Sequence, residues 1–383
     1  MAEGLGICFF GTYVTGEGYP INRVLINGLK DSGGAVSECR EELWQGFLHQ
    51  VFSGARPGAW PRLALRALGV YPRLIYRYLR SESHRVVIVG YPGYVDIVLA
   101  RLLNPFGRRL LVLVSFISLY DTVVLDRGQI AKDSWKAKLL YGIDRLAFRA
   151  ADLVLVDTGE VADYFARVFA LAPQKFHRSM VGNIFDGFEL SGIQEKLHCP
   201  LKVLFFGTYV PLHGIEYIVE AAELLREDEF EFSLIGSGQL YDSMRQEVEE
   251  RQLQRVNFVD EWISSEGLAE RIRAADVCLG IFGTTPKAAR VIPYKIFAAL
   301  ALRCPVITRD SPAVRELLAD GESALLCTAG SGAALAQALR RLRDERGLAA
   351  RLAQAGYESY RRSGSVAAIG RDLMQTLEVH SGY

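Results

Sequence analysis

The five-residue sequence Phe9-Phe10-Gly11-Thr12-Tyr13 occurs a second time as Phe205-Phe206-Gly207-Thr208-Tyr209. Each copy ends a short apolar run, and each is followed by a glycine-bearing loop and then by an apolar-periodic stretch. A strand, a glycine turn and a helix in this order form the first unit of a doubly wound α/β domain. Because the pattern occurs twice, we expect two such domains in tandem.

The composition fits two packed domains. The chain has 383 residues, half of them hydrophobic, which is enough to bury two cores. A formal net charge of zero argues against a protein that binds nucleic acid.

The six cysteines form no CxxC pair and the six histidines lack metal-ligand spacing, so we expect free thiols in a reducing cytosol and no metal. We see no signal peptide, and the longest apolar stretch, 110–120, is too short to span a membrane.

Apolar runs alternate with amphipathic segments in both halves of the chain. This alternation predicts parallel sheets with helical crossovers. The expected strands lie near residues 6–10, 34–38, 85–90, 110–116, 152–156 and 178–182, and near 201–206, 230–235, 255–259, 276–282, 305–308 and 323–327. The polar stretch 188–200 is the expected linker. We therefore expect domains at 1–190 and 199–362.

A basic loop follows the expected strand 276–282. It carries Lys287, Arg290 and Lys295 with no acid among them. Pro293 is expected at the first position of the next helix, whose N-terminal amides suit a phosphate. The loop is either a diphosphate site or a solvated basic loop, and we favour the first.

Two further turns of the second half are candidate ligand contacts. Gly236 and Gly238 follow a strand, but the third glycine of a dinucleotide fingerprint is missing, which argues against a nicotinamide dehydrogenase. Ser311 and Pro312 are a typical helix start. Glu316, one turn later, either accepts hydrogen bonds from a sugar or decorates the helix surface.

This ordered set of segments resembles the donor half of retaining family 4 glycosyltransferases, which have the GT-B fold. The matching segments are Phe206-Gly207-Thr208, His213-Gly214-Ile215, Ile235-Gly236-Ser237-Gly238, Ala299-Leu300-Ala301-Leu302, Pro305-Val306-Ile307 and Glu316 followed by Asp320-Gly321. The first half is similar through its glycine loop and 118–122. The resemblance implies two Rossmann-like domains facing across a cleft, with the acceptor on the first domain and a nucleoside diphosphate sugar on the second. It also implies that the last helix, within 366–383, crosses back to the first domain.

The resemblance also implies a reaction and its residues. In a front-face mechanism that needs no metal, the departing diphosphate takes the acceptor proton. Lys287 and Arg290 would stabilise that diphosphate, and Asp121 would be an acceptor-side base or hydroxyl ligand unless it is an exposed loop acid. The expected donor contacts are Gly207, Thr208, His213, Gly214, Gly236, Gly238, Lys295 and Glu316. The expected acceptor contacts are Gly11, Thr12, Gly16, Gly18 and Tyr120. The donor would be a UDP-, GDP- or TDP-sugar, and the acceptor a glycan, a lipid-linked molecule or a small molecule.

The chain departs from the family pattern at several positions. Many relatives carry a glutamate that holds the ribose hydroxyls where this chain has Ala298. The partner glutamate would fall at Arg290, and the usual arginine and lysine of the first turn are replaced by Thr208 and His213. An active transferase is our first interpretation. The alternatives are a catalytically silent paralogue that acts as a partner subunit, and a nucleotide-sugar epimerase or a phosphorylase.

The segment 60–80 contains five arginines and no acid, interleaved with apolar and aromatic residues. We expect Pro72 to split it into two short helices. A basic amphipathic segment of this kind suits an anionic membrane interface, which would fit a lipid-linked acceptor. The equal alternative is a sheet-covering helix with a solvated arginine face. The sequence thus predicts a cytoplasmic protein, in the first case peripheral at the inner face of the membrane.

Overall fold

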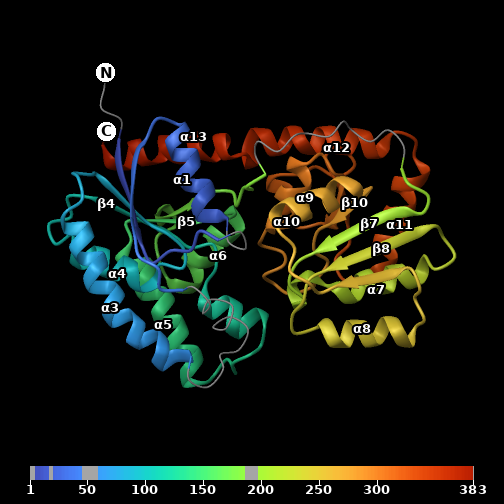
Figure 1. Ribbon diagram of the computed structural model, residues 1–383, viewed down its shortest axis with the longest axis horizontal. Helices are drawn as coiled ribbons and strands as arrows, with labels where there is room; N and C mark the ends of the chain where they lie inside the picture. The colour runs from blue at the N-terminus through green and yellow to red at the C-terminus, as the bar shows by residue number, and fades with distance from the viewer. Residues whose placement is uncertain (1–4, 17–19, 45–58, 186–196, 383) are drawn as a thin grey trace. The chain divides into compact units, whose positions relative to one another are not determined.

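The computed structural model describes residues 5–16, 20–44, 59–185 and 197–382. The chain divides into two compact units, one of Met1–Met180 with Val366–Tyr383 and the other of Val181–Ser365 (Figure 1). The sequence had suggested boundaries at 190, 199 and 362. Most of the expected linker 188–200 lies outside the described residues.

The first unit is built on a six-stranded sheet in which every pairing is parallel. Its strands are β1 (Gly6–Gly11), β2 (Ala35–Arg40), β3 (Val86–Val89), β4 (Leu110–Val114), β5 (Leu153–Val156) and β6 (Phe176–Arg178). The order in the sheet is β2-β1-β3-β4-β5-β6. From β1 the chain adds β2 on one side and β3 to β6 on the other, so the strand order reverses between β1 and β3. Ligands of open α/β sheets bind at such a point.

The second unit holds a second six-stranded parallel sheet. Its strands are β7 (Leu201–Phe206), β8 (Phe230–Ile235), β9 (Val256–Val259), β10 (Val277–Leu279), β11 (Val306–Arg309) and β12 (Leu325–Cys327). Their order is β12-β11-β10-β7-β8-β9, so the direction reverses between β7 and β10. Both copies of the repeated five-residue sequence thus begin in the strand next to the reversal, β1 or β7.

One expected strand is displaced. The sequence predicted a strand at 178–182, but β6 ends at Arg178. Phe176 is buried and pairs with β5, which fixes the start of the strand. Gly182 has a φ of +67°, which is not a strand conformation, so the segment cannot continue to 182.

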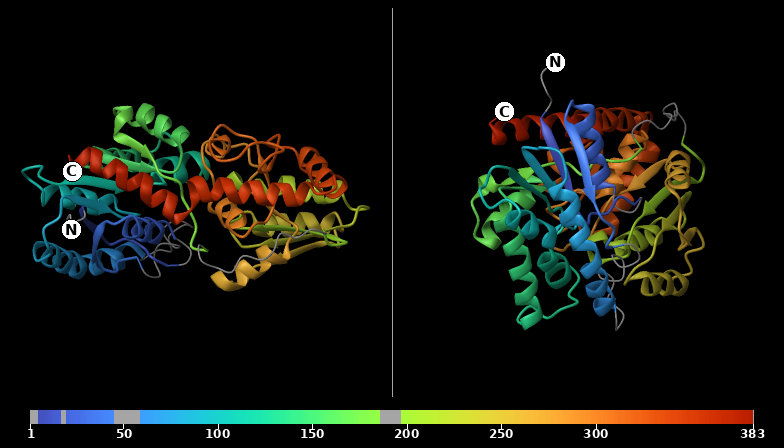
Figure 2. Two further views of the ribbon diagram at one scale, coloured as in Figure 1. Left: turned by 90° about the horizontal axis from the view of Figure 1, so that it is seen from above. Right: turned by 60° about the vertical axis from the view of Figure 1, so that its left-hand side comes forward.

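The helices of the first unit are α1 (Ile21–Asp31), α3 (Ala59–Leu79), α4 (Tyr94–Leu102), α5 (Trp135–Ala150), α6 (Gly159–Phe169) and α13 (Val366–Ser381), with helical turns η1 (Tyr120–Asp126) and η2 (Pro173–Lys175). The C-terminal α13 packs on α1, as Figure 2 shows. Gly28 and Gly370 permit this approach, because a Cβ atom on Gly370 would lie 2.0 Å from the Gly28 carbonyl oxygen.

Helix α3 corrects the prediction of two short helices. It is one helix of 21 residues with Pro72 in its interior. A proline removes the amide that would bond to the carbonyl four residues earlier, here that of Leu68. Pro72 and Leu68 are both exposed, so water can satisfy this carbonyl and the helix continues.

The second unit contains α7 (Ile215–Leu224), α8 (Tyr241–Glu250), α9 (Ser265–Ala274), α10 (Tyr294–Ala301), α11 (Gly332–Asp344) and α12 (Leu348–Ser359), with helical turns η3 (Pro211–His213), η4 (Val314–Glu316) and η5 (Tyr360–Gly364). Helix α10 begins one residue later than predicted, because Pro293 is its extended N-cap.

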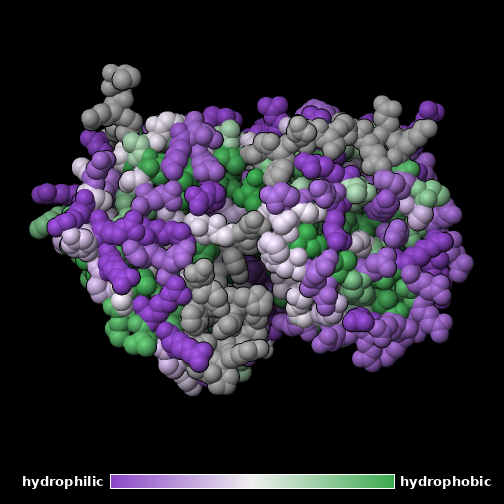
Figure 3. Space-filling model, viewed as in Figure 1, coloured by the Kyte–Doolittle hydropathy of each residue, from purple (hydrophilic) through white to green (hydrophobic). Residues whose placement is uncertain are grey.

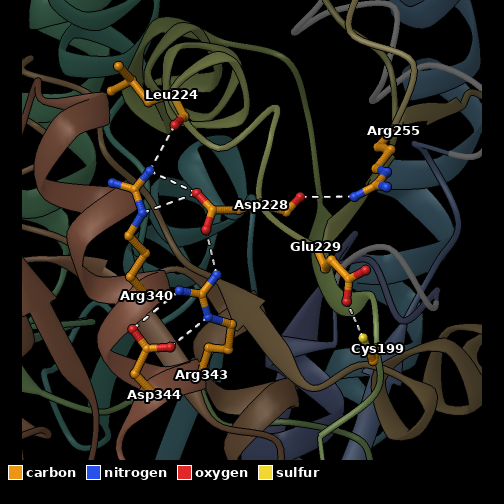
Figure 4. Close-up of polar contacts among 8 residues, drawn as sticks. All are labelled: Cys199, Leu224, Asp228, Glu229, Arg255, Arg340, Arg343 and Asp344. Carbon is orange, nitrogen blue, oxygen red and sulfur yellow. Dashed lines mark hydrogen bonds and ion pairs between the residues drawn. The ribbon is translucent and has the colours of Figure 1, made fainter.

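An ion-pair network fastens α11 to the segment before β8 (Figure 4). Asp228 accepts hydrogen bonds from Arg340 at 2.8 Å and from Arg343 at 2.6 Å. Arg340 also donates to the carbonyl oxygen of Leu224 at the end of α7. The network lies at the amino-terminal end of β8, opposite the sheet edge at which ligands bind.

Candidate functional site

The second sheet offers a ligand site where its strand order reverses. Gly207 follows β7 there with a φ of +142°, a conformation that favours glycine. A Cβ atom on Gly207 would lie 3.0 Å from Nζ of Lys295 and 3.3 Å from Cε1 of His213. The structure therefore brings together three residues that the sequence predicted for the donor site.

Lys295 lies beneath this glycine turn. Only 5% of the residue is exposed, and its Nζ is 3.7 Å from the centre of the Phe205 ring. Among the described residues, this Nζ has no hydrogen-bond partner. Burial lowers the pKa of Lys295 well below the usual lysine range, and the Cys278 thiol opposes the shift only in part. An anion bound at this point would stabilise the charged form of the amine.

His213 has a defined tautomer. Its Nδ1 bonds to the carbonyl oxygen of Thr208, and its ring meets Phe205 edge-on at 5.8 Å between centres. A carbonyl oxygen only accepts, so Nδ1 carries the proton, and Nε2 of the neutral ring is the unprotonated nitrogen. The carbonyl oxygen of His213 accepts a hydrogen bond of 2.9 Å from the amide of Phe282. The turn after β7 is thereby joined to the segment after β10.

The other glycines predicted for the donor site make room for protein backbone. A Cβ atom on Gly236 would lie 2.0 Å from the carbonyl oxygen of Gly207, and one on Gly238 would lie 2.7 Å from the backbone of Tyr209. A Cβ atom on Gly214 would lie 2.3 Å from a backbone nitrogen after β10. These glycines hold three turns against one another at the carboxyl edge of the sheet.

The basic loop lies between β10 and α10. Lys287 and Arg290 are half-buried there, and the amide of Arg290 donates to the carbonyl oxygen of Lys287 at 2.9 Å. Arg309, which the sequence analysis missed, ends β11 and donates from its guanidinium to the carbonyl oxygen of Gly283 at the start of the loop. Burial lowers the pKa of Arg309. The only sequence signal for it was its place directly after an expected strand.

Glu316 lies in a short helical turn rather than in a long helix. The expected helix start does form, because Oγ of Ser311 accepts a hydrogen bond of 3.2 Å from the amide of Val314. The turn ends after three residues, since Leu317 has a φ of −120° and leaves the helical conformation. Glu316 is half-buried in the segment that follows β11.

In the first unit, Tyr120 and Asp121 lie in the turn that follows β4. Asp121 is 4% exposed, so it is a buried acid rather than an exposed one. The amides of Tyr120 and Asp121 donate to Asp144 and to Ser118 at 2.9 Å and 3.0 Å. Asp144, which the sequence analysis did not single out, also accepts a hydrogen bond of 2.7 Å from Ser118 Oγ, and burial raises its pKa to about 6. Asp144 therefore holds this turn.

The turn after β1 carries the remaining predicted acceptor contacts. Gly11 has a φ of +125°, and a Cβ atom there would lie 2.6 Å from Oδ2 of Asp96. Thr12 donates to this oxygen through its amide at 2.6 Å and its hydroxyl at 2.9 Å. Gly16 is exposed, with open space around it, and Gly18 lies outside the described residues. Asp96 was also not predicted.

The second unit matches a known protein family. Residues 200–345 match the family described as "Glycosyl transferases group 1". The match lies within the second unit and covers less than half of the chain. The matched segment contains all six strands of the second sheet and every residue predicted for the donor site. The family that the sequence resembled is thereby confirmed.

A curated relative is also named as a glycosyltransferase. It is the amylovoran biosynthesis glycosyltransferase AmsK of Erwinia amylovora, which is 25% identical over 172 residues. The alignment covers 44% of this chain and 42% of AmsK. The match thus spans less than half the length of that relative.

Similarity to solved structures extends over nearly the whole chain. Sucrose-phosphate synthase from Thermosynechococcus elongatus has a TM-score of 0.69 at 17% identity, covering 100% of this chain and 97% of that one. HepE from Anabaena, in complex with UDP, has a TM-score of 0.66 at 15% identity, covering 98% and 100%. At these identities the similarity shows the fold, and it confirms the predicted GT-B fold with its two doubly wound units.

The described ranges contain neither a candidate membrane span nor a candidate metal cluster. None of the helices in these ranges has the length and apolar character needed to cross a membrane. Within the same ranges, no three or more His, Cys, Asp and Glu side chains come together in a way that could hold a metal ion.

Proposed function

We propose that the protein is a retaining glycosyltransferase that moves a sugar from a nucleoside diphosphate sugar to a hydroxyl of a glycan, lipid-linked or small-molecule acceptor. One observation carries the proposal. The buried amine of Lys295, without a hydrogen-bond partner among the described residues, lies beneath the glycine turn of a glycosyl transferases group 1 unit. The complex of HepE with UDP makes UDP-sugars the first donors to test.

The diphosphate would lie over Gly207, where Lys295 supplies its charge. Helix α10 begins one residue before Lys295, and the positive dipole end at its N-terminus would favour an anion there. Lys287 and Arg290, in the loop that leads into α10, would stabilise the charge that develops on the departing diphosphate. Because these cations offset that charge, we propose that the transfer needs no metal ion.

The reaction would use the leaving group as its base. The bond between the sugar C1 and the diphosphate oxygen breaks while the acceptor oxygen bonds to C1 on the same face. The acceptor proton passes to the departing diphosphate, so no protein nucleophile is required. Asp121 would orient the acceptor hydroxyl or assist its deprotonation, and its burial and the hydrogen bond from its amide to Ser118 suit a fixed position.

The first unit would also bind an anionic membrane surface through α3, at the cytoplasmic face. The unit contains 23 Lys and Arg against 18 Asp and Glu, and α3 itself contains no acid. Leu65, Leu68 and Leu79 are 72%, 73% and 68% exposed. They adjoin the exposed arginines of the helix, and Figure 3 shows hydrophobic and hydrophilic residues side by side in this region. Apolar and basic side chains on one exposed face are typical of interfacial helices.

Calorimetry with UDP, GDP and TDP tests the donor site. We expect one nucleotide to bind, and the Lys295→Met variant to bind it about 10- to 100-fold more weakly, since a hydrogen bond to a charged group contributes about 1.5–3 kcal/mol. Arg346→Ala removes an exposed cation between α11 and α12 and serves as the control. Equal affinity of the Lys295 variant and wild type would exclude the proposed diphosphate position.

A catalytically silent partner subunit is the second candidate, and Ala298 favours it. Ala298 is fully buried on α10, three residues after Lys295 and therefore on the same side of the helix. At the position where many relatives hold the ribose with a glutamate, this chain offers no hydrogen bond. Failure of all three nucleotides to bind would support the silent subunit over the transferase.

A further inference from the structure

The buried carboxyl group of Asp96 links the turn after β1 to the outer helix α3. Asp96 is 1% exposed and lies in the first turn of α4, beside the end of β1. Its Oδ2 accepts both hydrogen bonds of Thr12 described above, and its Oδ1 accepts a hydrogen bond of 2.9 Å from the hydroxyl of Tyr71. Tyr71 belongs to α3, so one carboxyl group joins three elements.

A second connection runs parallel to the first. Arg77 of α3 donates to the carbonyl oxygen of Arg40 at 2.7 Å and to Oε1 of Glu41 at 2.9 Å. The amide of Glu41 donates to the carbonyl oxygen of Gly11 at 3.3 Å. The helix is therefore tied to both residues of the turn, to Gly11 through Glu41 and to Thr12 through Asp96.

Further contacts restrain the Gly11–Thr12 turn. Gly11 carries no side chain because Oδ2 of Asp96 occupies that space. The hydroxyl of Thr12 also accepts a hydrogen bond of 3.0 Å from the indole of Trp44. Asp96, Tyr71 and Thr12 thus fix one geometry of the turn, and a shift of α3 would act on it directly.

We propose that Tyr71 and Asp96 are positioning residues that couple α3 to the acceptor-side turn, so that docking of α3 on an anionic lipid surface tightens the Gly11–Thr12 turn. The inference rests on the proposed function, which assigns the turn to the acceptor and α3 to the membrane.

Charge complementarity identifies an anionic lipid surface as the partner of α3. The outer face of α3 carries Arg62 and Arg73 beside its exposed leucines, and Arg80 directly follows the helix. The helix has no acid to repel anionic headgroups. Binding and turn geometry are then linked, since a ligand that favours one arrangement of α3 favours the turn that goes with it.

Hydrogen exchange of the full chain on vesicles tests this coupling. The probes are vesicles of phosphatidylcholine with and without phosphatidylglycerol, and the reporter is the peptide that contains the Thr12 amide. In wild type we expect several-fold slower exchange of this peptide when the anionic vesicles are bound. Tyr71→Phe removes one hydroxyl, and we expect it to bind the vesicles equally well without slowing the exchange.

The second unit supplies a matched control. Tyr357→Phe also removes one hydroxyl, but Tyr357 lies on α12 of the second unit and not on the proposed membrane surface, and we expect this variant to behave as wild type. Slowing of exchange in Tyr71→Phe to the wild-type extent would overturn the proposal. The proposal would also be overturned if wild type bound the vesicles without slower exchange of the Thr12 peptide, or if it did not bind anionic vesicles at low salt. Nucleotide affinity is measured on the same samples. Wild-type affinity in the variants shows that they are folded, and the affinity of wild type itself tests the transferase proposal separately.

Discussion

Nζ of Lys295 lies 3.7 Å from the centre of the Phe205 ring. A cation over an aromatic face in a desolvated site gains about 2 kcal/mol. Removing an ammonium group from water costs several kcal/mol, which is more than this gain. The desolvation cost therefore exceeds the gain from the aromatic ring, and the pKa of Lys295 is lowered rather than raised. The amine is held in a place that costs stability in the absence of an anion, as is common for functional groups.

The first prediction separates stability from binding at this lysine. Lys295→Met keeps an unbranched apolar side chain that reaches Cε and removes the amine, so we expect a thermal unfolding temperature equal to or above that of wild type. Nucleotide affinity falls at the same time, as argued above. Thermal unfolding with and without the nucleotide measures both effects. A variant that unfolds well below wild type would show that the amine stabilises the free protein, contrary to this expectation.

The second prediction concerns proton uptake. The pKa of Lys295 is low in the free protein, and a bound diphosphate would raise it. At a pH between the two values, nucleotide binding takes up a proton, so affinity weakens as the pH rises through this window. Calorimetry in buffers of different ionisation enthalpy measures the uptake. We expect it to be smaller in Lys295→Met, and an unchanged uptake in this variant would assign the proton to another group.

The sequence predicted most of the fold because the fold depends on local patterns. The two glycine turns, the alternation of apolar runs and the cations before Tyr294 can all be seen within short windows. Lys295 and Gly207 were both expected at the donor site, and the structure brings them together. Pro72 misled the prediction, since the rule against proline in helices has less force at an exposed position.

The missed residues share one property, which is that their partners are distant in the sequence. Asp96 bonds to Thr12, 84 residues away, and Asp144 bonds to Ser118, 26 residues away. Neither aspartate belongs to a recognisable motif, and each lies in an ordinary amphipathic helix. Their importance comes from burial at the carboxyl edge of a sheet. Only the tertiary structure shows which acids of a helix reach that edge.

The third prediction contrasts two glycines. Gly236→Ala would place a Cβ atom 2.0 Å from the carbonyl oxygen of Gly207 at a φ of +131°, so the backbone must shift. We expect a loss of about 3 kcal/mol or more in the free energy of unfolding, together with weaker nucleotide binding. Gly69→Ala, in open space on α3, should instead stabilise by about 0.5–1 kcal/mol. Denaturant unfolding measures both, and equal effects of the two substitutions would contradict the packing argument.

The fourth prediction concerns the pH dependence of stability at Asp144. Its pKa is about 6 in the folded protein and 3.8 in a model peptide, so the folded state binds the proton more tightly. The stability that this group contributes is therefore complete below pH 4 and is lost as the pH rises through 6. The shift corresponds to about 3 kcal/mol.

Asp144→Asn provides the comparison, because the amide does not titrate in this range. The variant loses one acceptor for the amides of Leu119 and Tyr120, so it should be less stable than wild type at low pH. The difference between the two proteins should shrink as the pH is raised from 4 to 7, since only wild type loses the contribution of the bound proton. Denaturant unfolding at several pH values measures this difference. A difference that grows with pH would mean that the fold favours the charged carboxylate, and that the hydrogen bonds of the Ser118–Asp121 turn outweigh its burial.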